Sequence, residues 1–175
     1  MERVNFTKID DFNETAEKAF TFHKAVIGMM LPEADIQHVG SSAIPNSITK
    51  GDLDIQVRVK PGQFTQAVQK LSKLYELNEG STKTETFRAF KDDTVTPPLG
   101  VQLTVINSEF DFFWKFRDVL LMNDQYRQEY DELKKNFEGK DMELYREAKN
   151  QFFEKLRASP EYSSVKESGS FDNRS

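Results

Sequence analysis

Residues 38–55 read HVGSSAIPNSITKGDLDI, and this stretch decides the fold that the sequence predicts. One apolar segment ends in Gly-Ser-Ser at 40–42, and a second carries Asp52 and Asp54. Alternate residues of a strand point to the same face, so the two aspartates would lie side by side. Neighbouring like charges are unfavourable unless a cation neutralises them, and Mg²⁺ prefers carboxylate and phosphate oxygens. Backbone N–H groups in the turn are suited to a phosphate. The stretch therefore indicates a metal–nucleotide site.

Each half of this pattern also has a simpler explanation. Gly-Ser-Ser at 40–42 is compatible with an ordinary strand-to-loop turn capped by a serine. Two alternate aspartates also occur on the solvated edge of a sheet. The residues alone leave both explanations open.

The spacing resembles the signature of the nucleotidyltransferase superfamily, in which Gly-Gly or Gly-Ser is followed, after a short loop, by Asp-apolar-Asp. A closer resemblance is to the GrpB-like family, and it runs in order from about residue 36 to 157. The similar blocks are His38 to Pro45, Lys50, Asp54-Ile55, Phe116 to Leu120, Tyr130 with Leu133 and Lys134, and Tyr145 with Lys149 and Phe152. The resemblance implies an α+β fold: a nucleotidyltransferase-like mixed sheet with an N-terminal helix and a C-terminal helical cap.

The resemblance also implies roles for individual residues. Asp52 and Asp54 would hold Mg²⁺ or Mn²⁺, and Asp54 aligns with the usual aspartate of the family. The phosphate-binding residues would be Gly40, Ser41 and Ser42, joined by His38 and Lys50. For His38 the alternative is a buried, hydrogen-bonded side chain.

Two positions depart from the family pattern. The second acidic position could fall at 56, where Gln56 would bind Mg²⁺ more weakly, so the ligand set is Asp52 with Asp54 or it is impaired. A third carboxylate would come from the strand at 101–106, which has Gln102 and Thr104 where the family has His-x-His-type residues. Neither side chain is a base near neutral pH. The acids nearby in sequence lie off that strand, at Asp92, Asp93, Glu109 and Asp111.

Three cations interrupt the apolar stripes of the C-terminal helices: Arg117, Lys134 and Lys149. Each lysine follows a tyrosine by four residues and shares its face. A buried cation needs a partner, so a shared anionic pocket is one explanation. Snorkelling of the lysines and a structural pair of Arg117 with Asp118 are the alternatives. Arg88 and Lys91 flank a strand end and are either further pocket residues or surface residues.

Composition limits the function classes. The chain has 175 residues, a net charge of −5 and no cysteine, which excludes disulfides, thiolate metal sites and cysteine nucleophiles. Its mildly acidic charge argues against broad binding to nucleic acid. We find no long apolar run and no basic leader, so we expect a cytoplasmic protein without membrane contact.

Periodicity predicts the elements along the chain. We expect helices over 10–31, from Pro61 onward, and over 109–122, 124–137 and 141–157. Strands are expected over 36–39, 53–59, 86–90 and 101–106, with a loop over 41–50 that has room for one helical turn. Residues 1–158 are expected to form one domain, and 159–175 a disordered tail.

The leading functional hypothesis is metal-dependent nucleotide binding, extending to nucleotidyl transfer to a small acceptor. In it, Asp52 and Asp54 are also the catalytic residues. The alternative is a non-catalytic binding protein for a nucleotide or another phosphorylated metabolite, favoured by Gln56 and by the absence of an acid over 101–106. Arg117, Lys134 and Lys149 would serve phosphate binding in either case. A purely structural or interaction domain is the third hypothesis.

Overall fold

The computed structural model describes residues 2–8 and 12–168. These residues form two compact units. We call the first the sheet unit, made of Glu14–Gly40 and Asp52–Trp114. The second, the helical unit, combines Ser41–Gly51 and the chain from Lys115 onward with the segment before Glu14. Both fall largely within the range expected to form one domain, and that expectation stays a prediction.

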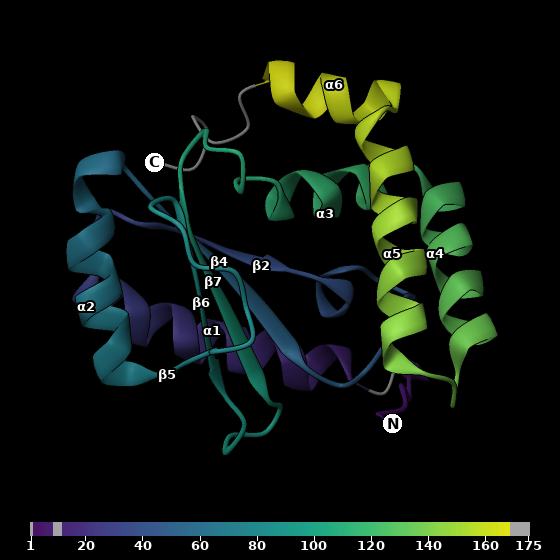
Figure 1. Cartoon of the computed structure of the whole chain (residues 1–175), viewed down its shortest axis with the longest axis horizontal. Helices are drawn as coiled ribbons and strands as arrows, with labels where there is room; N and C mark the ends of the chain where they lie inside the picture. The colour runs from purple at the N-terminus through teal and green to yellow at the C-terminus, as the bar shows by residue number, and fades with distance from the viewer. Residues whose placement is uncertain (1, 9–11, 169–175) are drawn as a thin grey trace. The chain divides into compact units, whose positions relative to one another are not determined.

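The sheet unit contains a five-stranded mixed sheet in the order β2-β4-β7-β6-β5 (Figure 1). Strand β4 runs parallel to β7, and the other neighbours pair antiparallel. The strands are β2 (Asp35–Val39), β4 (Leu53–Val59), β5 (Glu76–Leu77), β6 (Phe87–Asp92) and β7 (Leu99–Val105). Two helices belong to the unit: α1 (Asn13–Met30) and α2 (Phe64–Leu74), the latter preceded by a 3₁₀ turn at Pro61–Gln63.

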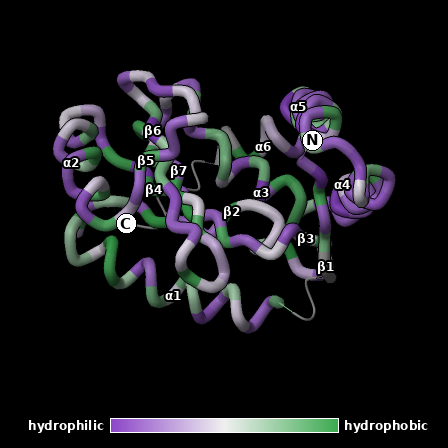
Figure 2. The backbone as a smooth tube through the Cα atoms, turned by 60° about the horizontal axis from the view of Figure 1, so that its bottom comes forward, coloured by the Kyte–Doolittle hydropathy of each residue, from purple (hydrophilic) through white to green (hydrophobic). Residues whose placement is uncertain are grey.

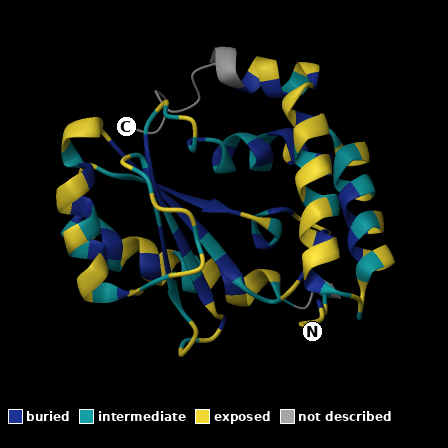
Figure 3. Ribbon diagram, viewed as in Figure 1, coloured by how far each residue is buried: buried dark blue, intermediate teal, exposed yellow. Residues whose placement is uncertain are grey.

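The alternation of β4 separates the two faces of this sheet. Its four apolar residues are buried against α1 and α2, together with alternate residues of β7. The strands are accordingly mostly buried in Figure 3. The opposite face carries the polar residues Asp54, Gln56 and Arg58. The predicted strands and the helix over 10–31 are confirmed to within a few residues.

The helical unit joins a short N-terminal strand to the C-terminal helices. Strand β1 (Thr7–Lys8) pairs antiparallel with β3 (Ile48–Thr49), which lies in the segment expected to be a loop. A 3₁₀ turn at Ser41–Ala43 precedes β3. The helices are α3 (Phe113–Met122), α4 (Asp124–Phe137), α5 (Met142–Arg157) and α6 (Pro160–Ser168). Helices α4 and α5 lie side by side (Figure 1), and most of their residues are hydrophilic (Figure 2).

The two long C-terminal helices have capping residues that the sequence supplies locally. Asn123 accepts a hydrogen bond from the backbone of Gln125 at 3.0 Å, and Asp141 accepts one from Glu143 at 3.2 Å. The stacked rings of Tyr130 on α4 and Phe152 on α5, 5.2 Å apart, join the pair.

The expected disordered tail needs a correction, because residues 160–168 form α6. Ser159 Oγ accepts a hydrogen bond from the backbone of Tyr162 at 3.2 Å, and Pro160 occupies the first helical position. Tyr162 and Val165, one turn apart, are both buried. The helix therefore has a cap and an apolar face that composition alone did not reveal. Residues 169–175 lie outside the described residues.

None of the described helices is both long enough and apolar enough to cross a membrane.

We expect the stability of the sheet unit to fall as His23 becomes protonated. His23 on α1 is buried, with Nδ1 3.3 Å from the Tyr75 hydroxyl. Burial lowers the pKa of His23 from its ordinary 6.5, and the nearby Asp92 opposes this more weakly. Burial likewise raises the pKa of Tyr75 to about 12. The unfolded chain therefore binds the histidine proton first as pH falls through 6.5, which lowers the free energy of unfolding below that pH and leaves it unchanged above.

Melting curves between about pH 7.5 and pH 5 would measure this effect. His23→Gln should remove its part of the pH dependence. An NMR titration midpoint for His23 at or above 6.5 would contradict the expectation.

Candidate functional site

Asp54 lies between two glycines, Gly40, which follows β2, and Gly100, which is on β7. Residue pairing sets Val39 of β2 and Gly100 of β7 beside it. A Cβ atom on Gly40 would stand 2.6 Å from Asp54 Oδ2, and one on Gly100 would stand 2.9 Å from Oδ1. Gly40 also has φ +77°, a conformation that other residues rarely adopt. Both carboxylate oxygens of Asp54 therefore occupy space that any larger residue at 40 or 100 would fill.

Asp52 directly precedes β4 and is half-buried. Alternation along an extended chain assigns it to the same side as Asp54. Across residues 2–8 and 12–168, no group of three or more acidic or histidine side chains is gathered as a metal site would require. The two aspartates thus stay the predicted ligand pair, and any further ligand has to be of another chemical type.

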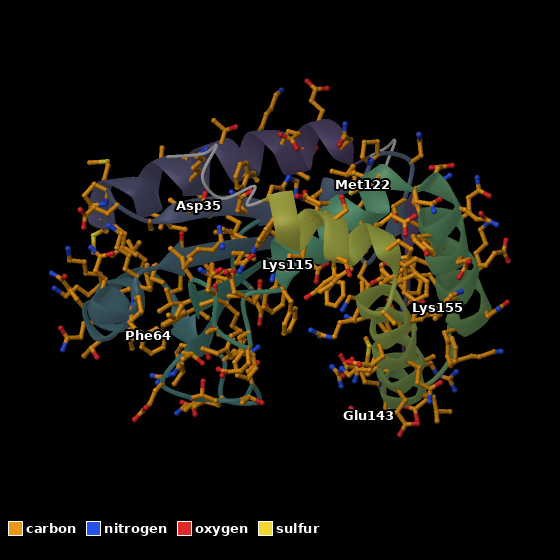
Figure 4. The ribbon with its side chains drawn as sticks, turned by 90° about the horizontal axis from the view of Figure 1, so that it is seen from above. Asp35, Phe64, Lys115, Met122, Glu143 and Lys155 are labelled. Atoms are coloured by element: carbon orange, nitrogen blue, oxygen red, sulfur yellow. The ribbon has the colours of Figure 1, made fainter. Side chains whose placement is uncertain are left out.

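Lys91 is on the same face as Asp54, because it pairs directly with Gly100 across β6 and β7. Its ammonium lies 3.2 Å from the Asp93 carboxylate, and this hydrogen bond raises the pKa of Lys91. Arg88, the other candidate at this strand end, is on the opposite face, with its guanidinium 5.6 Å from the centre of the Phe64 ring on α2 (Figure 4 labels Phe64). Of the two cations, the register therefore associates only Lys91 with Asp54.

His38 is also on the helix-covered face of the sheet, because it pairs with the core residue Ile55. Its Nδ1 lies 3.1 Å from Glu17 on α1, and its ring stacks on Phe20 at 5.1 Å. His38 is therefore buried and has a polar partner within the protein, as in the alternative to phosphate binding considered from the sequence. A contact between His38 and a ligand stays a prediction.

Gln56 is fully buried and hydrogen-bonded at both ends of its amide. Its nitrogen donates to Thr104 Oγ1 and to Asp111 Oδ1, both at 2.9 Å. Its oxygen accepts from the backbone N–H of Trp114 at 3.0 Å. Gln56 therefore holds the segment 107–114 against the sheet. From the sequence, position 56 was considered only as a metal ligand, and this structural role was not expected.

Arg58, also fully buried, is the centre of the same network. Its Nε and Nη2 donate to the two carboxylate oxygens of Asp111 at 2.7 and 2.6 Å, and Nη1 donates to Asp35 Oδ2 at 2.8 Å (Asp35 is labelled in Figure 4). The Trp114 ring lies 4.8 Å away. Burial by itself lowers the pKa of Arg58, but the hydrogen bonds to Asp111 and Asp35 outweigh it and the pKa is raised. The guanidinium stays charged inside the protein.

This network explains why the predicted helix over 109–122 begins only at Phe113. Asp111 accepts hydrogen bonds from Arg58, Gln56 and the Trp114 indole, and its own backbone is in a turn. Phe110 stacks on Phe87 of β6 at 4.7 Å. The sequence analysis noted Asp111 only as an acid off the strand. Arg58 alternates with the core residues and so reads as part of the polar face of the strand, and no local pattern indicated that it is buried and needs an acid.

Ser41 and Ser42 belong to the helical unit, where Lys134 of α4 fixes the loop that they begin. The Lys134 ammonium is fully buried and donates to Ser41 Oγ at 2.8 Å, Ser47 Oγ at 3.1 Å and the Ile48 carbonyl at 2.5 Å. It also lies 3.8 Å from the centre of the Tyr130 ring. Lys134 therefore has protein acceptors for its three N–H groups, and its direct binding to phosphate stays a prediction.

Asp131, one turn before Lys134, completes this anchor. Its Oδ1 accepts hydrogen bonds from Ser47 Oγ at 2.8 Å and the Ile48 backbone at 3.2 Å. Its Oδ2 accepts from Arg127, which also donates to the Asn46 carbonyl. Helix α4 thus holds the loop from 41 to 48 through the buried side chains of Lys134 and Asp131 and through Arg127. Of these three, the sequence singled out only Lys134, and as a phosphate-binding cation.

The other predicted phosphate-binding cations have different surroundings. Arg117 donates through Nε and Nη2 to Asp118 Oδ1 at 3.0 and 2.8 Å, which is the structural pair considered as an alternative. Lys149 Nζ lies 5.9 Å from the Tyr145 ring centre on its own helix. Lys50 is exposed. Their binding to a ligand stays a prediction.

Comparison with known proteins gives a consistent result. The family model described as GrpB protein matches residues 7–159. A UPF0157 protein of Vibrio cholerae is 34% identical over 155 residues, which are 89% of this chain and 82% of that protein. The crystal structure of conserved protein GrpB from Enterococcus faecalis has a TM-score of 0.62 at 19% identity, covering 75% of this chain and 81% of that one.

A further structural match is the STING-associated CdnE c-di-GMP synthase of Capnocytophaga granulosa. Its TM-score is 0.53 at 12% identity, covering 71% of this chain and 52% of that one. At such identities the likeness shows the fold alone. The expected α+β, nucleotidyltransferase-like fold is confirmed.

Proposed function

Because the chain belongs to the GrpB family, we propose that it binds a nucleotide or another phosphorylated small molecule through a divalent cation, Mg²⁺ or Mn²⁺, held by Asp52 and Asp54. The observation that carries the proposal is the position of Asp54 between Gly40 and Gly100, where a Cβ on either glycine would collide with a carboxylate oxygen. Glycine is the usual residue where the backbone must approach another group closely, and here two glycines leave room for one carboxylate.

The donor chemistry fits the cation. Two carboxylates on one side of an extended chain supply hard oxygen ligands, and Mg²⁺ is commonly bound by one or two carboxylates together with phosphate oxygens. When bound, the cation would neutralise negative charge on the phosphates. Lys91, on the same face as Asp54, is ion-paired with Asp93, so the cation would supply the positive charge that attracts an anionic ligand.

The proposal is for binding, and nucleotidyl transfer is not included. Strand β7, the parallel partner of β4, carries Gln102 and Thr104 on the face of Asp54. Thr104 and Gln56 belong to the closed network around Arg58. Neither Gln102 nor Thr104 can take a proton from an attacking hydroxyl near neutral pH.

We take the protein to act in the cytoplasm, as expected from its composition.

Thermal shift measurements with ATP, GTP, CTP and UTP, each with and without MgCl₂, test this proposal. A ligand that binds only the folded state raises the melting temperature, by about 5–10 °C for a chain of this size at a hundredfold excess over Kd. We expect a Mg²⁺-dependent shift with at least one nucleotide, and its loss in Asp54→Asn.

Glu79→Gln, which neutralises an exposed acid of the same unit, is the matched control and should keep the shift. If Asp54→Asn kept the shift as well, the assignment of Asp54 would be wrong. If no nucleotide gave a Mg²⁺-dependent shift, nucleotide binding itself would be contradicted.

A further inference from the structure

Gln102 on β7 has a buried amide oxygen without a partner. Among the described residues, its Oε1 is one of two buried side-chain atoms that make no hydrogen bond. Gln56, which pairs with it across the ladder, has hydrogen bonds at both ends of its amide. Buried polar atoms are nearly always hydrogen-bonded, so an unpartnered buried oxygen indicates a functional role such as binding an ion.

The position of Gln102 indicates that role. The point where a Gly100 Cβ would stand is 3.4 Å from Gln102 Nε2 and 2.9 Å from Asp54 Oδ1. The ends of the Asp54 and Gln102 side chains therefore both lie over Gly100. Gly100 is paired with Asp54 across the strands and precedes Gln102 by two residues on β7. The amide presents its nitrogen at this point, and an amide N–H is a hydrogen-bond donor that suits a neighbouring carboxylate.

We propose that Gln102 supplies a third, neutral oxygen ligand to the cation at Asp52 and Asp54; this inference rests on the proposed function. A half-turn of the amide exchanges its nitrogen and oxygen and brings Oε1 over Gly100, on the side of Asp54. No hydrogen bond of Oε1 opposes that turn. Amide carbonyls and carboxylates are both oxygen ligands of divalent cations.

A neutral third ligand has a chemical consequence. Two carboxylates and an amide oxygen give the site two negative charges, so a single divalent cation balances them. An amide accepts a hydrogen bond or a metal, but it does not take up a proton near neutral pH. The site would thus hold a metal–phosphate complex without activating a hydroxyl for attack, which fits a protein that binds its ligand and releases it unchanged.

Titration of the full-length protein with MnCl₂, followed by the EPR signal of free Mn²⁺, tests the inference without any activity assay. Gln102→Leu keeps the approximate size and removes the oxygen, and we expect it to weaken Mn²⁺ binding by about tenfold or more. Gln102→Glu adds a charge at the same position, and we expect it to tighten binding by about tenfold. Gln69→Leu on the exposed side of α2 is the matched control and should behave as wild type.

A second measurement separates a ligand from a residue that only supports the fold. Without metal, the melting temperature of Gln102→Leu should equal or exceed that of wild type, because the substitution removes an unpartnered buried acceptor.

The outcomes distinguish this inference from the proposed function. If Asp54→Asn abolishes Mn²⁺ binding while Gln102→Leu stays within twofold of wild type, Gln102 is not a ligand and the proposed function stands. If Gln102→Leu does not fold, failure of Gln102→Glu to tighten binding overturns the inference in the same way. If wild type does not bind Mn²⁺, both the inference and the metal-dependent function are overturned.

Discussion

Asp111→Ala is expected to lower the free energy of unfolding by about 3–5 kcal/mol, because it removes the carboxylate that accepts hydrogen bonds from both Nε and Nη2 of the fully buried Arg58 guanidinium. The Asp111 carboxylate also accepts hydrogen bonds from the Gln56 amide, the Asn107 backbone and the Trp114 indole. Removing one carboxylate thus leaves several buried donors unsatisfied at once. Urea unfolding followed by circular dichroism measures the loss.

Trp114 is the only tryptophan in the chain and reports on the same place. Its ring lies over Arg58, so we expect its fluorescence in Asp111→Ala to shift toward that of a solvated indole before global unfolding. This local signal distinguishes opening of the segment 107–114 from loss of the whole sheet unit.

Two further variants test the physical reason. Asp93→Asn, at an exposed acid that also has an ion pair, should change stability by less than about 0.5 kcal/mol. The double variant Arg58→Met with Asp111→Leu should recover only the part of the loss that comes from the unpaired guanidinium, because the donors of Gln56, Asn107 and Trp114 stay without the Asp111 carboxylate. If the double variant were as unstable as Asp111→Ala, the unpaired charge of Arg58 would not be the cause.

Lys134→Met is expected to lower the free energy of unfolding by about 2–4 kcal/mol and to loosen the loop that begins at Ser41. Methionine keeps most of the apolar stem but cannot donate to the two serine hydroxyls and the Ile48 carbonyl that the ammonium contacts. It also leaves the buried carboxylate of Asp131, 3.7 Å from the ammonium, without that charge. Hydrogen exchange of the backbone amides over 41–48 should become faster, and urea unfolding gives the stability.

Lys135→Met is the matched control, since the Lys135 side chain, next to Lys134 in sequence, is exposed and its ammonium lies 3.7 Å from Glu132 on the same helix. It should leave both the exchange rates and the stability close to wild type. Equal behaviour of the two variants would mean that the buried contacts of Lys134 contribute nothing to the loop.

Most secondary structure could be predicted because its signals are local. The alternation over 53–59 and the apolar stripes of α4 and α5 repeat with the periods of a strand and a helix, and they recur in the structure with few changes in bounds. Helix α6 was missed because, over residues 160–165, whose burial is described, only Tyr162 and Val165 are buried, and its signal is mainly the cap at Ser159 and Pro160. A short, polar helix has too weak a pattern to be distinguished from a tail.

The candidate site was predicted in part. The Gly-Ser turn and Asp54 are close in sequence, and the structure brings Gly40 against Asp54 as their spacing suggests. Gly100 and Gln102 come from a strand far along the chain, and only the register of β4 with β7 brings them to the same point. The face on which His38 lies also depends on register, because a shift of one residue moves a side chain to the other side of the sheet.

By itself, the sequence determined the elements, the polar face of β4 and the pair of aspartates, since these depend on neighbours along the chain. Which buried polar side chains are hydrogen-bonded within the protein, and which keep an unpartnered atom, depends on the tertiary structure. Gln56 and Arg58 are bonded to Asp111, Lys134 is bonded to the loop from Ser41, and Gln102 keeps an unpartnered oxygen beside Asp54. The physical reason is that burial and hydrogen-bond partners come from segments brought together by strand pairing and helix contacts, and no local pattern encodes which segments meet.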